Sequence, residues 1–298
     1  MPRELTAIIL AVVSAVFIAV GIVVRQRSTM GVPEEHSVSG AMATALVRQP
    51  LWWAGTAVAV GGYVFQALAL SKGSLLLVQP VLVSSLLFAL PLSARLSHRR
   101  VTRSEWMWAV VLTVAIAAFV VVGNPRPGHA RPPGPAWAAV AVVAVPLVVL
   151  CVLGAARQAG RRRAVLLAVA VAVLFAVVAV LTKASVFRLA HGGVPHLLST
   201  PTPYVLAVVA LAATVLQQSA FHAGALQVSV PTMIVLEPLV AVTIGIAVLG
   251  EHLTVGGPGV VGLAISVVAM VVATVALARD AALHEEELHP SVQPIRPR

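Results

Sequence analysis

Apolar positions occur along this chain in long, unbroken runs and do not alternate with polar positions. Short clusters of Arg, Pro or Gly separate the runs, most of which are about 18–24 residues long. A helix needs about 20 mostly apolar residues to cross a bilayer, whereas a barrel strand shows alternation over about 10. The pattern predicts an all-α integral membrane protein with about nine transmembrane helices. The expected spans are about 5–24, 51–71, 74–96, 104–123, 136–155, 164–183, 203–222, 226–250 and 257–278.

The segment 31–48 does not fit this pattern. It contains Glu34, Glu35 and His36 and only a short apolar stretch, which favours a loop or an interfacial half-helix. The three residues are sequential and lack the spacing of metal ligands, so we expect a solvated loop. A tenth membrane segment at 31–48 stays open and would change the topology.

Composition supports a membrane protein. The chain is 59% hydrophobic and 10% charged, whereas soluble domains carry roughly a quarter charged residues. The net charge of +10 comes from basic residues in the short connections, which are explained by membrane topology and contact with anionic lipid, so we expect no nucleic-acid partner. The single cysteine, Cys151, excludes a disulfide within the chain and a cysteine-based metal site. The first run lacks a basic leader and a cleavage site, so we expect it to be retained as a helix.

The distribution of Lys and Arg predicts the orientation in the membrane. With nine spans, fourteen of the 20 basic residues fall on one side and six on the other. Because basic residues concentrate in cytoplasmic loops, we expect the N-terminus outside and the C-terminus in the cytoplasm. Residues 280–298 contain too few apolar side chains to fold and are expected to form a disordered cytoplasmic tail.

An internal repeat is indicated by a recurrent offset of about 151–158 residues. Along this offset Phe17 matches Phe175 and Arg25 matches Lys183; further pairs, in the same order, are Gln66 with Gln218, Gly73 with Gly224, Pro80 with Pro231, and Val101-Thr102 with Leu253-Thr254. Each half supplies four helices, so the fifth span is a linker that inverts the second half. The expected organisation is a first repeat at 1–123, a linker helix at 124–160 and a second repeat at 161–279. Inverted repeats are typical of carriers that open alternately to either face.

Several short motifs resemble those of the drug/metabolite transporter (EamA-like) superfamily. They are Phe17-Ile18-Ala19-Val20-Gly21, Leu51-Trp52-Trp53-Ala54-Gly55, Gln66-Ala67-Leu68-Ala69, Leu76-Leu77-Val78-Gln79-Pro80, Leu236-Glu237-Pro238-Leu239 and Leu249-Gly250-Glu251-His252-Leu253-Thr254. Those of the first half are most similar to the NIPA-type magnesium transporters, a branch that also has nine predicted spans. The resemblance covers roughly residues 5–278 and implies a transporter. Where the superfamily often has a Gly-Glu pair at the end of the third helix, this chain has Arg99 and Arg100, which weakens the implication of magnesium.

Glu237 is the first candidate for a functional side chain, because it is the one well-buried carboxylate that we expect inside the spans. A charged group at membrane depth costs at least about 2.5–3.5 kcal/mol, so it normally faces a cavity or a partner. A carboxylate that only packs, protonated or paired with Lys183, is the alternative. Pro80, Pro231 and Pro238 remove backbone donors and are expected to break helices and free carbonyl groups.

The remaining candidates for the substrate or coupling-ion pathway are Lys183 and the amides of Gln66, Gln79 and Gln218. Lys183 ends the sixth predicted span and equally suits a snorkelling anchor. Amides line pathways but also join helices in lipid, and the repeat favours Gln66 and Gln218. A metal ligand set is not identified, since magnesium prefers several oxygen ligands and the spans offer one carboxylate.

The sequence therefore predicts a secondary active transporter of a small solute that works by alternating access, with proton coupling through Glu237 left open. The alternatives are a NIPA-like magnesium transporter and a non-transporting membrane scaffold or assembly subunit. Enzyme motifs are absent, so we expect neither catalysis nor a cofactor. The expected partners are the lipid bilayer and a small-molecule or ion substrate, with a homodimer left open. An Ala-, Val- and Arg-rich, Lys-poor composition suggests a GC-rich bacterial genome and hence the cytoplasmic membrane.

Overall fold

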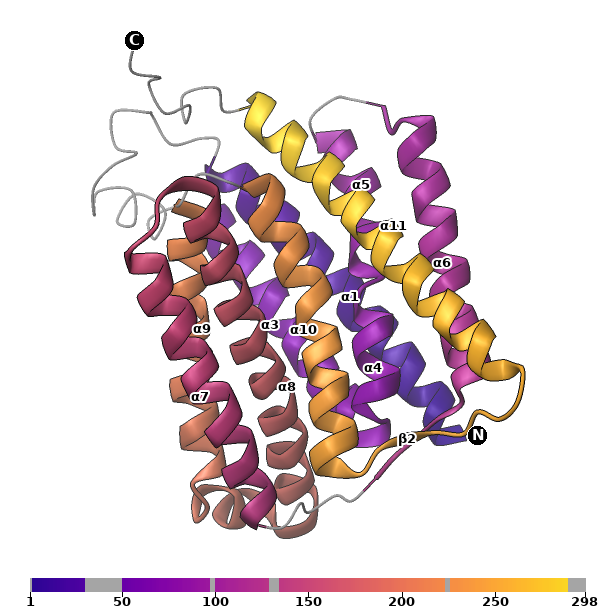
Figure 1. Ribbon diagram of the computed structural model, residues 1–298, viewed down its shortest axis with the longest axis vertical. Helices are drawn as coiled ribbons and strands as arrows, with labels where there is room; N and C mark the ends of the chain where they lie inside the picture. Colours follow the sequence, from indigo (N-terminus) through magenta and orange to yellow (C-terminus); the bar gives the residue numbers. More distant parts are fainter. Residues whose placement is uncertain (1, 30–49, 97–99, 129–133, 223–225, 289–298) are drawn as a thin grey trace.

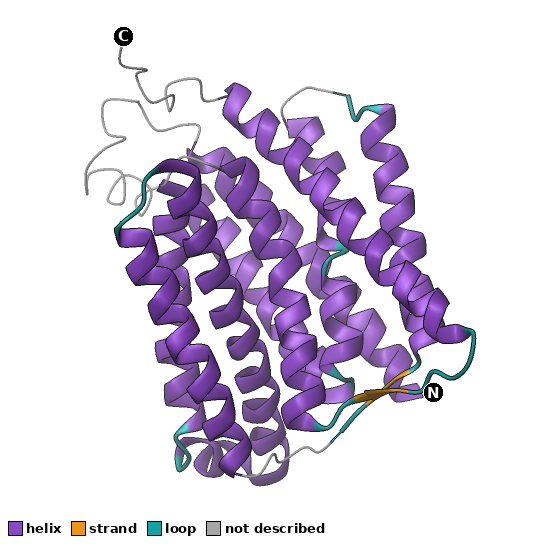
Figure 2. Cartoon of the chain, in the orientation of Figure 1, coloured by secondary structure: helices purple, strands orange, loops and turns teal. Residues whose placement is uncertain are grey.

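The structure is a computed structural model that describes residues 2–29, 50–96, 100–128, 134–222 and 226–288. Within these ranges the chain is almost wholly helical (Figure 2). Nine of the described helical segments are long and apolar enough to cross a bilayer. This confirms the prediction of an all-α, multi-pass membrane protein. The segment 31–48, with Glu34, Glu35 and His36, lies outside the described residues.

The third span consists of two helices, and a two-stranded ladder joins two of the loops. The elements are α1 Pro2–Thr29, α3 Pro50–Lys72, α4 Leu75–Leu82, α5 Ser85–Leu96, α6 Arg103–Gly123, β1 Pro125–Arg126, α7 Gly134–Ala156, α8 Gly160–Leu198, α9 Thr202–His222, α10 Leu226–Leu249, β2 His252–Leu253 and α11 Gly259–Leu288.

Successive spans run up and down the bundle, so α1 begins and α11 ends at opposite ends (Figure 1). We call the end that holds β1, β2 and the start of α1 the β end. Helix α1 packs on α3, α4 and α5, and α8 packs on α7, α9 and α10. Helix α6 packs on α11, and α4 contacts α10, so the two halves of the chain meet along both pairs.

Small residues allow α1 and α3 to approach closely. Ala7, Ala11, Ala15 and Ala19 recur at every fourth position of α1 and are fully buried. A Cβ atom on Gly21 would lie 2.9 Å from the Cβ and the backbone nitrogen of Ala59. Ser14 Oγ also donates a hydrogen bond to the carbonyl of Gly62 at 2.7 Å. Such small-residue faces and interhelical hydrogen bonds hold helices together in lipid, where the hydrophobic effect does not.

Two helices extend beyond their predicted ends. Helix α8 does not stop near Lys183 but continues to Leu198 through a kink at Gly193, whose φ is 68°. Helix α11 continues to Leu288, so residues 280–288, which the sequence assigns to a disordered tail, are helical. Polar and charged residues outside the apolar window remain helical in both cases, because hydropathy locates a span and not the end of its helix. Residues 289–298 lie outside the described residues.

Candidate functional site

The carboxylate of Glu251 caps the first turn of α4 from the other half of the chain. Its Oε1 accepts a hydrogen bond from the backbone N–H of Leu75 at 3.0 Å, and its Oε2 accepts one from Leu76 at 3.1 Å. The first N–H groups of a helix have no partner within the helix and carry partial positive charge, so a carboxylate there is stabilising. Ser74 adds a local cap, since its Oγ accepts from the N–H of Leu77 at 3.1 Å.

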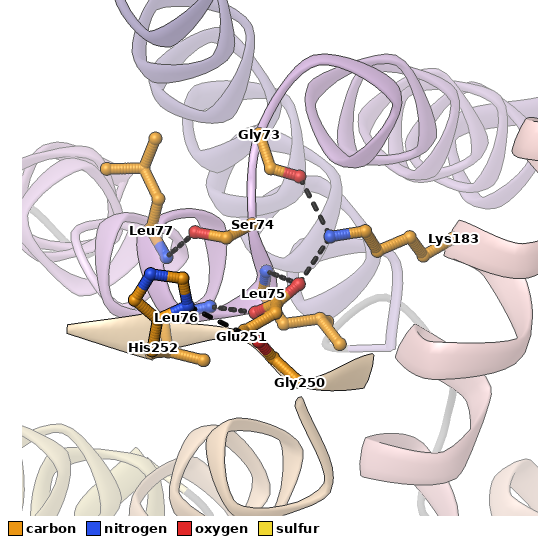
Figure 3. Close-up of polar contacts among 9 residues, drawn as sticks. All are labelled: Gly73, Ser74, Leu75, Leu76, Leu77, Lys183, Gly250, Glu251 and His252. Atoms are coloured by element: carbon orange, nitrogen blue, oxygen red, sulfur yellow. Dashed lines mark hydrogen bonds and ion pairs between the residues drawn. The ribbon is translucent and has the colours of Figure 1, made fainter. Parts of the chain in front are cut away.

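Lys183 of α8 neutralises this carboxylate. Its Nζ donates to Glu251 Oε1 and to the carbonyl of Gly73, the latter at 3.1 Å (Figure 3). The Glu251 side chain is fully buried and that of Lys183 is 15% exposed. We refer to Glu251, Lys183, Gly73, Leu75 and Leu76 as the Glu251 cluster. A buried pair of this kind is costly to break from one side, because the remaining charge loses its partner.

Two glycines allow Glu251 to reach α4. Helix α10 ends at Leu249, and Gly250 turns the chain with a φ of 63°, a value that side chains disfavour. The N–H of Glu251 then donates to the carbonyl of Gly245 at 3.1 Å. A Cβ atom on Gly245 would lie 3.0 Å from Glu251 Oε2 and 3.1 Å from Leu76 Cδ1. A side chain at 245 would therefore push α10 away from the cluster.

The third span is interrupted at its middle, where Val83 and Ser84 separate α4 from α5. The N–H of Val83 donates to the carbonyl of Pro80 at 3.2 Å, and that of Ser84 donates to the carbonyl of Val81 at 3.0 Å. Both bonds reach back three residues, as in a 3₁₀ turn, and not four as in an α-helix. Pro80 has no N–H and therefore leaves the carbonyl of Leu76 without its usual helical donor. The break follows Pro80 by one turn, and Pro80 itself lies inside α4.

Buried polar groups without a partner flank this break. Gln79 is 2% exposed and Ser84 is 8% exposed. Neither Gln79 Nε2 nor Ser84 Oγ has a hydrogen-bond partner among the described residues. An amide or hydroxyl that is buried without a hydrogen bond costs roughly 1–3 kcal/mol by mutational measures. Unsatisfied groups at this depth therefore require an explanation.

Glu237 and Ser84 both lie near the middle of their spans. Counted from the β end, Ser84 is nine residues into the span Leu75–Leu96, and Glu237 is twelve residues into the span Val228–Leu249. Nearer the β end, Gly245 of α10 packs against Leu76 of α4. Glu237 is eight residues from Gly245, and Ser84 is eight residues from Leu76, which is about 12 Å of helix in each case. Glu237 is partly buried, and within the described part of the chain no hydrogen bond or ion pair involves it.

The structure therefore revises the role of several predicted residues. Lys183 lies inside α8, not at its end, and its carboxylate partner is Glu251, not Glu237. Helix α10 runs without a break through Pro231 and Pro238, which corrects the expectation that these prolines interrupt it. Prolines are tolerated inside transmembrane helices where neighbouring helices, hydroxyl side chains or small backbone adjustments satisfy the freed carbonyl groups.

The amide pair suggested by the repeat differs in environment. Gln66 is partly buried on α3, whereas Gln218 is exposed on α9 and has an interaction partner. Gln79, by contrast, is buried on α4 close to the break. Of the three amides, Gln79 is therefore the buried one, and it lies between the Glu251 cluster and the break.

Other features offer less to a polar ligand. No group of three or more His, Cys, Asp and Glu side chains is placed to hold a metal ion within the described ranges. An open surface groove of about 460 Å³ between α6 and α11 is lined by apolar side chains, including Trp108, Val111 and Val268. The candidate site therefore extends from the Glu251 cluster near the β end, past Gln79, to Ser84 and Glu237 near the middle of the bundle.

Glu251 was not predicted as a site residue from the sequence. Its Gly-Glu motif contributed to the superfamily resemblance but was assigned no role. The available signal was topological. The predicted spans put only Glu4 and Glu251 as carboxylates on the side that carries Lys183 and the turn at Gly73. Charge pairing within that side would have reduced the carboxylate partners of Lys183 to Glu4 and Glu251.

Comparison with known proteins gives one informative match. The chain is 39% identical over 283 residues to an uncharacterized protein of Corynebacterium glutamicum, and the match covers 95% of this chain and 98% of the relative. No protein-family model matches the chain, and no solved structure matches it.

Proposed function

The chain belongs to the same family as the Corynebacterium glutamicum protein, and for this multi-pass membrane protein we propose a function as a secondary transporter of a small solute. The solute crosses by alternating access, with its site at the middle of the bundle. Glu237 serves as the titratable group of that site and couples transport to protons. We place the protein in a bacterial cytoplasmic membrane with the N-terminus outside, following the asymmetry of Lys and Arg.

The observation that carries this proposal is the interruption of the third span near its middle, at about the level of Glu237 along the bundle. Backbone irregularity at membrane depth is tolerated only where protein buries it or water reaches it. Carriers commonly place such broken helices at the substrate site, near the midplane. The unpartnered Gln79 Nε2 is a donor and Glu237 is a potential acceptor, so a solute with both kinds of polar group could satisfy them.

The contacts between helices support an organisation in two repeats. Helices α1 and α3 pack together as do their proposed equivalents α8 and α9, and α1 contacts α4 and α5 as α8 contacts α10. The contacts of α4 with α10 and of α6 with α11 join proposed equivalents. The repeats at 1–123 and 161–279, joined by α7, are consistent with this pattern, and two such halves can exchange conformations.

Uptake into proteoliposomes tests the proposal. Purified protein is assayed with a panel of small metabolites and with magnesium, with and without a proton gradient, in the native form and as Glu237→Gln. The substitution keeps the shape of the side chain and removes its charge. Glu4→Gln is the matched control, because Glu4 lies at the start of α1 and pairs with Arg126 at the surface.

The outcomes separate the candidate functions. Gradient-driven metabolite flux that is lost in Glu237→Gln and kept in Glu4→Gln supports the proposed carrier. Magnesium flux that depends on Glu237 favours a NIPA-like transporter instead. Correctly folded protein that moves none of the solutes favours a scaffold or assembly subunit.

A further inference from the structure

We propose that the Glu251 cluster is the gate at the β end of the bundle, where Lys183 and Glu251 lock α4 against the loop that follows α10. In the described conformation the gate is closed. Opening it separates Glu251 from α4 and exposes Gln79 and Ser84 to the β end. This inference rests on the proposed transport function for its purpose, but its geometry and its test are independent of any solute.

The residues around Glu251 connect elements from both halves of the chain. Glu251 binds α4 and Lys183 of α8. His252 and Leu253 form β2, which pairs antiparallel with Arg126 and Pro125 of β1. The N–H of Thr254 donates to the carbonyl of Gly123 at 3.1 Å, and its Oγ1 donates to that of Asn124 at 2.8 Å. A single four-residue segment thus fastens the β end across the boundary between the proposed repeats.

The position of the cluster suits a gate. Leu75 precedes Ser84 by nine residues, so the cluster lies about 13 Å from the break, on its β-end side. Leu75 and Leu76 pack against Gly245 of α10 at the same level. The close contact between α4 and α10 is therefore located between the β end and the unpartnered polar groups of Gln79 and Ser84.

The chemistry of the cluster suits a reversible contact. Burial of two charges is expensive, and their attraction and hydrogen bonds largely offset that cost, so the net gain on closing is modest. When the gate opens, water can replace Glu251 at the N–H groups of Leu75 and Leu76 and can solvate Lys183. Exchange of protein hydrogen bonds for water hydrogen bonds changes the free energy little.

A second ion pair at the β end, between Arg126 and Glu4, is exposed where the Glu251 cluster is buried. Arg126 Nη1 lies 3.0 Å from Glu4 Oε1, with side-chain exposures of 45% and 34%. Exposed pairs of this type contribute about 0–1 kcal/mol. The Arg126–Glu4 pair therefore provides a control at the same end of the molecule, because its hydrogen bond joins β1 to α1 and not to α4.

Thiol accessibility tests the gate. Cys151, the one native cysteine, is replaced by Ala, and Ser84→Cys places a reporter at the break. A membrane-impermeant charged maleimide is applied to intact cells and to inverted vesicles, and an N-terminal tag identifies the face that carries the β end. We expect slow labelling from that face in the parent protein. Glu251→Ala and Lys183→Ala should accelerate it about tenfold or more, whereas Arg126→Gln should not change it.

Exchange of the two charges distinguishes the gate from a simple ion pair. In the double variant K183E/E251K a lysine stands at 251 and cannot accept the N–H groups of Leu75 and Leu76. We therefore expect labelling to stay fast. Recovery of slow labelling in the exchanged protein would overturn the lock on α4, because the ion pair alone would then close the gate. Unchanged labelling in well-folded Glu251→Ala would overturn the gate itself.

A milder variant covers the case in which Glu251→Ala does not fold. Glu251→Gln keeps an oxygen acceptor but loses the charge that attracts Lys183. Amide hydrogen exchange should then accelerate in peptides containing Leu75 and Leu76 and stay unchanged in peptides of α6. Equal exchange in both proteins would contradict the gate. Because neither measurement uses a transported solute, a failure of the gate is distinguishable from a failure of the transport proposal.

Discussion

Lys183 Nζ donates to the carbonyl of Gly73 at 3.1 Å, which joins the middle of α8 to the turn between α3 and α4. The two residues are 110 positions apart in the sequence. Through this bond and its pair with Glu251, one ammonium group holds three separate parts of the chain together. Loss of this ammonium group should therefore change the stability of the protein as well as the accessibility of a cysteine at position 84.

Lys183→Met should destabilise the protein by about 3–5 kcal/mol, because it leaves the buried carboxylate of Glu251 without its counter-charge. The double variant K183M/E251Q should recover part of this loss, since the uncompensated charge is gone. Unfolding in detergent by denaturant or heat measures both. Additive losses in the double variant would contradict the proposed coupling.

Gly245→Ala should destabilise the protein by about 1–3 kcal/mol through overpacking, because its new Cβ atom would lie 3.0 Å from Glu251 Oε2 and 3.1 Å from Leu76 Cδ1. Gly256→Ala is the matched control, since no atom lies within 4 Å of the corresponding Cβ position. Thermal unfolding of the two variants should differ clearly. Equal stability would show that α10 can shift away from Glu251 without cost.

Gly21→Ala should weaken the contact between α1 and α3. The added Cβ atom would meet the backbone nitrogen of Ala59 at 2.9 Å, so the helices themselves must separate. Gly262→Ala on α11 serves as the control, with its nearest atom at 3.9 Å. A lower unfolding temperature for Gly21→Ala alone is the expected result. Indistinguishable unfolding temperatures would mean that the small-residue packing is not tight.

Gln79→Leu should separate stability from function. Leu has a similar volume and lacks the unpartnered Nε2 group, so the unfolding temperature should stay constant or rise. Flux in proteoliposomes should fall, because the solute loses a donor. A stability loss of more than about 1 kcal/mol would instead indicate that Gln79 has a structural hydrogen bond.

The spans could be predicted because each depends on local information. An apolar run of about 20 residues has few alternatives in lipid, and the nine runs correspond to the nine membrane-long helices of the described chain. The ends could not be predicted in the same way. Helix α8 continues past Lys183 because helical hydrogen bonding persists outside the apolar window, as far as Leu198.

The candidate site was only partly accessible from the sequence. Glu237 and Gln79 could be selected because a polar side chain in an apolar run is unusual at any such position. The break at Val83 and Ser84 could not be predicted from the prolines. Pro80, Pro231 and Pro238 each lack an N–H group in the same way, yet among these spans only the third is interrupted. The partner of Lys183 required knowledge of tertiary packing, because Glu251 approaches it from a loop.

The cap on α4 also bears on the order in which the protein can be completed. Leu75 and Leu76 bind a carboxylate that lies 176 and 175 residues further along the chain. A ribosome adds roughly 5–20 residues per second, so α4 waits on the order of ten seconds or more for Glu251 to be synthesised. During that interval its first N–H groups depend on water, on lipid headgroups or on the insertion machinery. Maturation of the amino-terminal half is therefore tied to the arrival of the carboxy-terminal half.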